Sequence, residues 1–162
     1  MSSKTSRAAV DVGQQLESLR RSYVIAYPRQ RLHVAKLRIN NPGHDPNRLI
    51  AFVSAAEGLA RSLCMHHRVR RRSELAALYP NYIRRGPESL VGEFLAAKGL
   101  GKPRDYFGAE TWEHFEFAVQ YRNVLAHECT YLGADLSPKL IKACRTVLRA
   151  LAKEARLDPD DI

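Results

Sequence analysis

Residues 109–128 read AETWEHFEFAVQYRNVLAHE, and their hydrophobic spacing predicts a long amphipathic helix. At about 3.6 residues per turn, one apolar stripe runs along this helix and contains Trp112, Phe115, Ala118, Val119, Leu125 and Ala126. Arg122 falls in the middle of the stripe. A guanidinium group on a core-facing line costs free energy unless an anion or a hydrogen-bond acceptor meets it, so Arg122 needs a partner.

A second apolar line lies on the far side of the same helix and consists of Phe117, Tyr121 and Val124. A helix that is apolar on two sides is usually covered on both, either deep within a bundle or between a bundle and a partner subunit. We therefore expect neighbours on both sides of this helix.

Helical spacing predicts further helices elsewhere in the chain. The segments are 8–27, 45–70, 73–78, 87–100 and 137–156, with 32–39 fitting either a helix or a strand and taken as a helix. Pro28 is expected to stop or kink the first helix, and 102–108 is expected to be a loop. These elements predict an all-α protein, an antiparallel helical bundle of four to five main helices with short connectors.

The inward faces of three predicted helices follow from the same spacing. They are Leu49, Phe52, Val53, Ala56, Leu59, Ala60 and Leu63; Leu90, Val91, Phe94 and Leu95; and Leu140, Ile141, Cys144, Val147, Leu148 and Leu151. A chain of 162 residues is long enough for one such core and too short for two comfortable domains. We expect 1–45 to be an N-terminal helical extension packed on the core, 46–156 the bundle, and 157–162 a loose tail.

The net charge and the cysteine content of the chain indicate which kinds of partner and which cellular compartment to expect. Lys and Arg total 26 against 17 Asp and Glu, a net charge of +9, which favours polyanionic partners such as nucleic acid. Cys64, Cys129 and Cys144 have no paired spacing, so neither disulfides nor a metal site is predicted, and no cofactor is expected. No run is long enough to cross a membrane, and a reducing cytoplasm is the expected compartment.

Basic residues gather in two places. The denser group, without an intervening acid, contains Arg61, Arg68, Arg70, Arg71 and Arg72. One interpretation is a favourable interaction of cations with a helix C-terminus plus ordinary solvation, and the other is a track for a phosphate backbone. The second group, Lys142, Arg145, Arg149 and Lys153, lines the outer side of the last helix and is expected to be a solvated face.

Arg122 and His127 are suited to RNA phosphate chemistry. RNA carries its own nucleophile, the 2′-hydroxyl, so a protein can cleave it without a metal by moving one proton and stabilising phosphate charge. A histidine can give or take a proton near neutral pH, and an arginine can pair with a phosphate oxygen. The sequence therefore offers both groups on one helix.

Their positions on an unbroken helix differ. Residues five apart lie about 140° apart around the axis and about 7.5 Å apart along it, so Arg122 and His127 do not share a face. Asn123 and His127, four residues apart, do. We expect Asn123 to orient His127, while Arg122 reaches the reacting group from another direction or from another chain.

The neighbouring residues resemble a known family. Asn123 follows Arg122 directly, Glu128 follows His127, and an aromatic-rich helix leads in. With these residues, 109–130 resembles the HEPN family, all-helical domains whose signature is an Arg, often followed by Asn, and then a His after four to six residues. The resemblance nominates Arg122, Asn123 and His127 as the catalytic residues, and we add Glu128 as a supporting residue.

The resemblance implies a metal-independent endoribonuclease, often a toxin or phage-defence effector, in which two chains place their motifs together in a cleft. RNA, a second copy of the chain, and an antitoxin or regulatory protein are the implied partners. HEPN toxins paired with minimal nucleotidyltransferase antitoxins tend to have Tyr two residues after the His, where this chain has Cys129 and then Tyr131. The alternative is a non-catalytic HEPN-like module for nucleotide or nucleic-acid binding or for dimerisation.

Glu57 has two interpretations. It lies on the edge of the apolar face of the helix that starts at Asp45, among small residues. It is either a helix-edge carboxylate in water or a supporting residue that holds Arg122 in position. The second interpretation would provide the partner that Arg122 needs.

Overall fold

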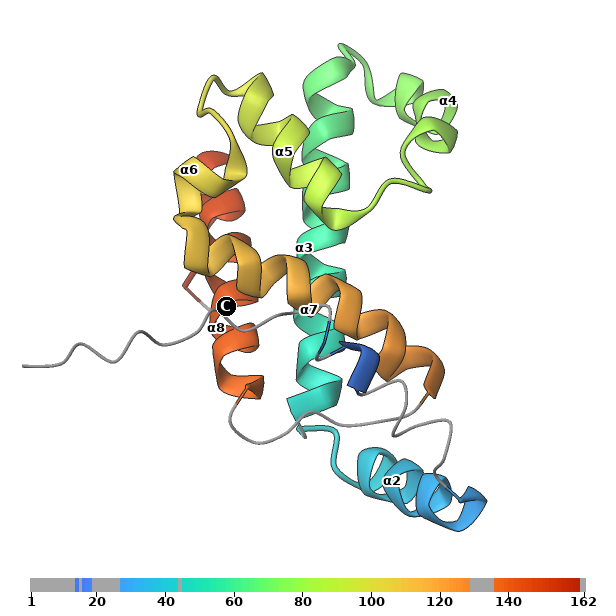
Figure 1. Cartoon of the computed structure of the whole chain (residues 1–162). Helices are drawn as coiled ribbons and strands as arrows, with labels where there is room; N and C mark the ends of the chain where they lie inside the picture. The colour runs from blue at the N-terminus through green and yellow to red at the C-terminus, as the bar shows by residue number, and fades with distance from the viewer. Residues whose placement is uncertain (1–13, 15, 19–26, 44, 129–135, 161–162) are drawn as a thin grey trace, which may run out of the picture.

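Helices make up the regular structure of this chain (Figure 1). The computed structural model describes residues 14, 16–18, 27–43, 45–128 and 136–160. In this part the elements are α2 (Pro28–Asn40), α3 (Asp45–Arg68), η1 (Arg72–Glu74), α4 (Leu75–Leu78), η2 (Tyr79–Asn81), α5 (Pro87–Ala97), α6 (Pro103–Phe107), α7 (Ala109–Glu128) and α8 (Ser137–Glu154). These residues form no strand, so the predicted all-α class is confirmed.

The core lies where α3, α5, α7 and α8 meet. α3 and α8 lie side by side and run in the same direction, while α7 crosses both in the opposite sense and α5 covers the upper half of α3 (Figure 1). The largest side chains with almost no exposure include Tyr82, Phe94, Phe115, Phe117 and Tyr121. Burial of such aromatic side chains dominates the stability of a helical core.

Both apolar lines of α7 are buried, as the sequence predicts. Phe117, Tyr121 and Val124 are covered within the chain itself, so no partner subunit is needed to cover them. Ala126 is the exception on the other line: it is exposed because the last turn of α7 extends past α3 (Figure 1). Both apolar sides of α7 are therefore largely covered by other parts of the same chain.

The predicted inward faces of the other helices are confirmed with few exceptions. Every residue predicted to face inward from α5 and α8 is buried. On α3, the members at the edge of the face are half-buried and pack against the core, namely Phe52, Leu59 and Leu63. Helical spacing therefore located the core correctly.

Proline positions account for the main errors in the predicted boundaries. Pro28 opens α2, where its missing N–H would be unpaired anyway. Residues 19–26, over which the first predicted helix would end, lie outside the described residues. The side chain of Gln30 then accepts a hydrogen bond from the Tyr27 backbone N–H at 2.8 Å. Likewise 102–108, predicted to be a loop, contains α6, which begins at Pro103. Of the helix predicted over 8–27, residues 14 and 16–18 are described before Tyr27, and they are helical.

α2 stands apart at the lower end of the molecule (Figure 1). Leu32, Leu37 and Ile39 of this helix are exposed, Ile39 at 75%, whereas Val34 and Ala35 are half-buried. Asn47, in the first turn of α3, donates a hydrogen bond to the Arg38 carbonyl at 2.9 Å. Leu16, by contrast, belongs to the core. The predicted extension 1–45 thus has one described segment in the core and one that projects from it.

Among the described helices, none has the length and the apolar character needed to cross a lipid bilayer.

Replacing either of two glycines by alanine is expected to change the stability of the fold, in opposite directions. Gly108 ends α6 with φ 82° and ψ 148°, a backbone region where a side chain costs about 1–3 kcal/mol. Gly58 lies inside α3, where an added Cβ would meet nothing within 4 Å. We expect Gly108→Ala to lower the free energy of unfolding by about 1–3 kcal/mol and Gly58→Ala to raise it by about 0.5–1 kcal/mol. Urea unfolding measures both, and equal signs for the two variants would contradict this assignment.

Candidate functional site

Arg122 has the partner that its position requires. Its guanidinium reaches from α7 to α3, where Nη1 donates to Oε2 of Glu57 at 2.5 Å. The two side chains are 21% and 19% exposed, so the ion pair is largely but not fully shielded from water. Of the two interpretations of Glu57, the structure shows the one in which it contacts Arg122.

The other oxygen of Glu57 accepts a hydrogen bond from Arg61, one turn further along α3. Arg61 also donates through Nε to the backbone carbonyl of Tyr82 at 3.3 Å, and its side chain is 17% exposed. Glu57, Arg61 and Arg122 together form what we call the Glu57 cluster. Arg61 was predicted to bind nucleic acid, but its guanidinium is engaged within this cluster and lies apart from the exposed arginines.

The charges of the Glu57 cluster shift the pKa of Glu57 and that of the neighbouring Glu88. Burial by itself raises the pKa of Glu57, but hydrogen bonds from Arg122 and Arg61 and their charges hold that pKa below its ordinary value. Burial raises the pKa of the nearby Glu88 above its ordinary value. The charges of Glu116 and Glu57 add to this effect, while a hydrogen bond from its own backbone and the charge of Arg122 oppose it. Glu57 is therefore held as the anion, whereas ionisation of Glu88 is opposed.

These two shifts predict opposite pH dependences. The stabilising effect of Glu57 is present above its ordinary pKa of 4.5 and is lost as pH falls through its lower folded-state pKa. We expect Glu57→Gln to be less stable than the wild type at pH 7, by a difference that shrinks below about pH 4.

Ionised Glu88 destabilises the fold, so Glu88→Gln is expected to be more stable than the wild type at pH 7, and this difference also shrinks in acid. Urea unfolding across this pH range tests both expectations, and a Glu88→Gln variant that is less stable than the wild type at pH 7 would contradict them.

The other motif residues lie at the end of α7 and face solvent. The helix continues unbroken through Glu128, and Asn123, His127 and Glu128 are all exposed. Asn123 and His127 share a face, as predicted from their spacing. Arg122, directed toward α3, lies about 140° around the axis and about 7.5 Å along it from His127. One chain therefore does not bring Arg122 and His127 onto a common face.

Arg38 is a neighbour of the motif that sequence analysis missed. From α2, its Nη1 donates to the backbone carbonyl of Leu125 at 2.6 Å, and its Nε donates to Asn47 at 3.1 Å. The last carbonyls of a helix have no partner within the helix, and a cation there also interacts favourably with the helix dipole. Arg38 thus fixes the end of α7 that carries His127. Its partner is 87 residues away in sequence, and no local pattern points to it.

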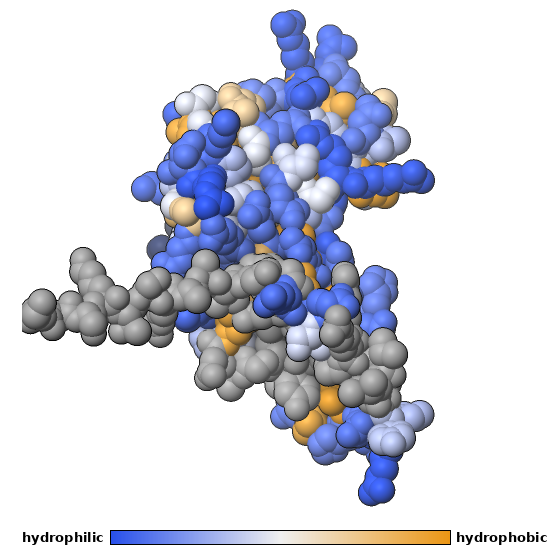
Figure 2. Space-filling model, in the orientation of Figure 1, coloured by the Kyte–Doolittle hydropathy of each residue, from blue (hydrophilic) through white to orange (hydrophobic). Residues whose placement is uncertain are grey.

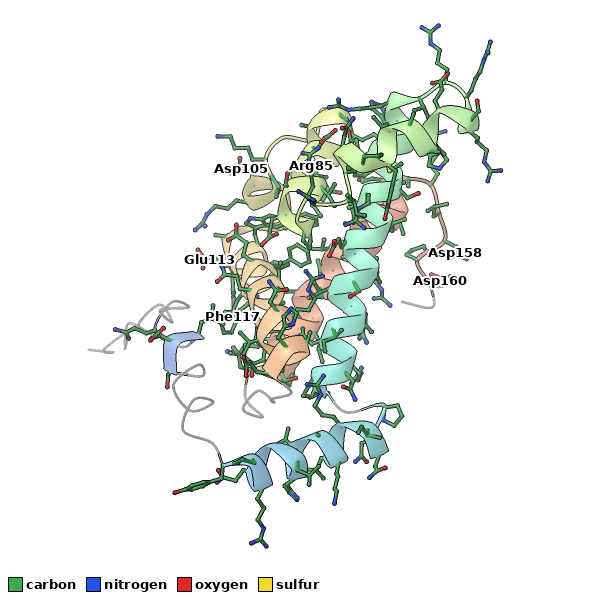
Figure 3. All side chains as sticks on the ribbon, turned by 90° about the vertical axis from the view of Figure 1, so that its right-hand side faces the viewer. Arg85, Asp105, Glu113, Phe117, Asp158 and Asp160 are labelled. Carbon is green, nitrogen blue, oxygen red and sulfur yellow. The ribbon has the colours of Figure 1, made fainter. Side chains whose placement is uncertain are left out.

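The remaining predicted nucleic-acid-binding residues lie at and just beyond the C-terminal end of α3. Its 24 residues span about 36 Å, and long hydrophilic side chains project around η1 and α4 at the upper end (Figures 2 and 3). Arg68 pairs with Glu93 at 2.9 Å and remains 59% exposed. Arg70, Arg71 and Arg72 are exposed, and no ion pair holds their side chains within the described ranges.

Cys64 and Cys144 are buried thiols that are not expected to be reactive. Burial raises the pKa of Cys64 to about 11 and that of Cys144 to about 12, which keeps both thiols protonated at neutral pH. Cys129 and Tyr131, which bear on the HEPN subgroup, lie outside the described residues. In the part of the chain that the structure describes, no three or more His, Cys, Asp or Glu side chains are grouped to hold a metal ion.

Comparisons of the chain with protein-family models, with curated proteins and with solved structures find no match.

Proposed function

We propose that this protein is a metal-independent endoribonuclease of the HEPN type, with Arg122, Asn123 and His127 as its catalytic site. The observation that carries the proposal is the Arg122–Glu57 ion pair of 2.5 Å, which holds a guanidinium on the helix whose end presents His127 to solvent. A partly exposed guanidinium that is already oriented needs little reorganisation to meet phosphate charge.

In the proposed reaction, the imidazole of His127 acts as a base and removes the proton of the RNA 2′-hydroxyl. The 2′-oxygen attacks the adjacent phosphorus, and the bond from phosphorus to the 5′-oxygen breaks. The departing 5′-oxygen takes a proton from water and His127 returns its proton to the solvent, so the products are a 2′,3′-cyclic phosphate and a 5′-hydroxyl. Arg122 stabilises the negative charge on the non-bridging phosphate oxygens, and Asn123 orients the imidazole.

A homodimer is part of this proposal. Since Arg122 and His127 lie on different sides of α7, we infer that a second copy completes the cleft by bringing its own α7 end to the same phosphodiester. The biological setting we propose is cytoplasmic, as a toxin or phage-defence effector held in check by an antitoxin or regulatory protein. Light scattering at micromolar concentration tests the dimer, and a monomeric mass would count against a shared cleft.

A non-catalytic module for nucleotide or nucleic-acid binding, or for dimerisation, is the second candidate. The exposed arginines at the far end of α3 favour it, because they suit a polyanion without needing His127. Incubation with labelled RNA in EDTA separates the two functions. Cleavage that the chelator leaves unchanged and His127→Ala abolishes supports the nuclease, while binding without cleavage in both proteins supports the module.

The exposed arginines predict the salt dependence of RNA binding. If Arg71 and Arg72 each contact one phosphate, replacing both with Gln should reduce the slope of log K against log salt concentration by about 1.4. The matched control replaces Arg149 and Lys153 of α8, which are also exposed. Fluorescence anisotropy over a salt series measures the slopes, and equal changes in both double variants would show that Arg71 and Arg72 have no special part in binding.

A further inference from the structure

A second site lies between α7 and α8, away from the motif. There the first turns of α7 and the first half of α8 line a cavity of about 250 Å³ that is partly open to solvent. Thr111 and His114 face it from α7, and Lys139 and Lys142 face it from α8. His114 precedes His127 by thirteen residues, which is about 20 Å along the helix. The cavity is thus separate from the proposed catalytic site.

Its charge is predominantly positive. Lys139 and Lys142 are exposed, and within the described ranges no ion pair engages either ammonium group. The carboxylate of Glu110 is the only acidic group among the described lining residues. Two lysines and a histidine directed at one space favour an anion.

The helical register explains why these side chains meet. Lys139, Lys142 and Ala143 are spaced at i, i+3 and i+4, so they share one face of α8. Ala143 is 4% exposed and lines the cavity with a single methyl group. A larger side chain at this position would occupy space that the cavity now leaves open, so the alanine keeps the site accessible.

We propose that this cavity binds the phosphate group of a phosphate monoester. Lysine ammonium groups bind phosphate as point charges, and the Thr111 hydroxyl and the His114 ring add further hydrogen-bond donors. A volume of about 250 Å³ lies below the roughly 300–1,000 Å³ of sites that enclose drug-sized ligands. In the proposed complex the two lysines hold the phosphate, and Glu110, which lines the same cavity, accepts hydrogen bonds from hydroxyl groups on the rest of the ligand.

Isothermal titration calorimetry with the full chain tests this site. The probes are inorganic phosphate, ribose 5-phosphate, and one oligoribonucleotide with and without a 5′-phosphate, titrated into His127→Ala protein to prevent cleavage. We expect the phosphorylated probes to bind, and replacement of Lys139 and Lys142 by Gln to weaken binding about tenfold or more. The matched control replaces Arg149 and Lys153 by Gln and should change the affinity less than about twofold.

The outcomes separate the sources of the phosphate. Tighter binding of the 5′-phosphorylated RNA than of its unphosphorylated form assigns the site to RNA ends, and equal binding of ribose 5-phosphate assigns it to small metabolites. Absence of binding, or equal weakening in the two double variants, overturns the proposal. Ala143→Leu should block binding without changing either lysine, and circular dichroism verifies its fold. Because His127 is absent in every titration, failure here leaves the nuclease proposal untouched.

Discussion

Replacement of His127 by alanine is expected to lower the rate of RNA cleavage in EDTA by about 100- to 10,000-fold. This range is what removal of a general acid or base typically costs. The side chain is exposed at the end of α7, so the free energy of unfolding should change by less than about 0.5 kcal/mol. Single-turnover cleavage of labelled RNA gives the rate, and urea unfolding gives the stability.

Two further variants make the test of His127 specific. Asn123→Ala should lower the cleavage rate by about tenfold or more, since it removes only the group that orients the imidazole. His33→Ala removes another exposed histidine, on α2, and should leave the rate unchanged. Cleavage that survives His127→Ala at the wild-type rate would remove His127 from the catalytic site.

Arg122→Lys is expected to lower the cleavage rate by about 100-fold while reducing the free energy of unfolding by less than about 1 kcal/mol. Lysine keeps the positive charge that Glu57 pairs with, but it lacks the planar fork that binds two phosphate oxygens at once. Glu57→Gln should have the larger effect on stability. It leaves Arg61 and Arg122 beside each other without an anion and should cost about 2 kcal/mol.

The comparison distinguishes catalysis from folding. If Arg122 serves the fold alone, Arg122→Lys will retain cleavage and its rate will follow stability across both variants. If Arg122 contacts the phosphate, the lysine variant will be folded but slow. A lysine variant with the wild-type rate would contradict a phosphate-binding role for Arg122.

The sequence predicted most of the fold because apolar residues recur at helical intervals over long segments. The buried faces of α5 and α8 illustrate this, since each follows from spacing alone. The errors in the predicted helix boundaries arose at prolines, because proline can either interrupt a helix or occupy its first turn. Pro28 and Pro103 open helices in the structure, whereas an isolated proline in a sequence suggests a break equally well.

The site was predictable only in part. The position of Arg122 on an apolar stripe required a partner, and Glu57, at the edge of the apolar face of α3, was one candidate whose other interpretation was a carboxylate in water. Arg61 and Arg38 were not assigned their roles, because their partners depend on how α3, α2 and α7 pack. Contacts between side chains of helices that are distant in sequence produce no repeating residue pattern, so they cannot be predicted from spacing.

A nuclease that uses the 2′-hydroxyl as its nucleophile is tested by comparing one RNA with its fully 2′-O-methylated counterpart, each incubated with the purified protein in EDTA. Mass spectrometry identifies the ends of the products. The proposed mechanism predicts cleavage of the unmodified RNA alone, with 2′,3′-cyclic phosphate and 5′-hydroxyl ends, because the methylated strand lacks the nucleophile. Cleavage of both strands, or cleavage of RNA only after a divalent metal is added, would contradict it.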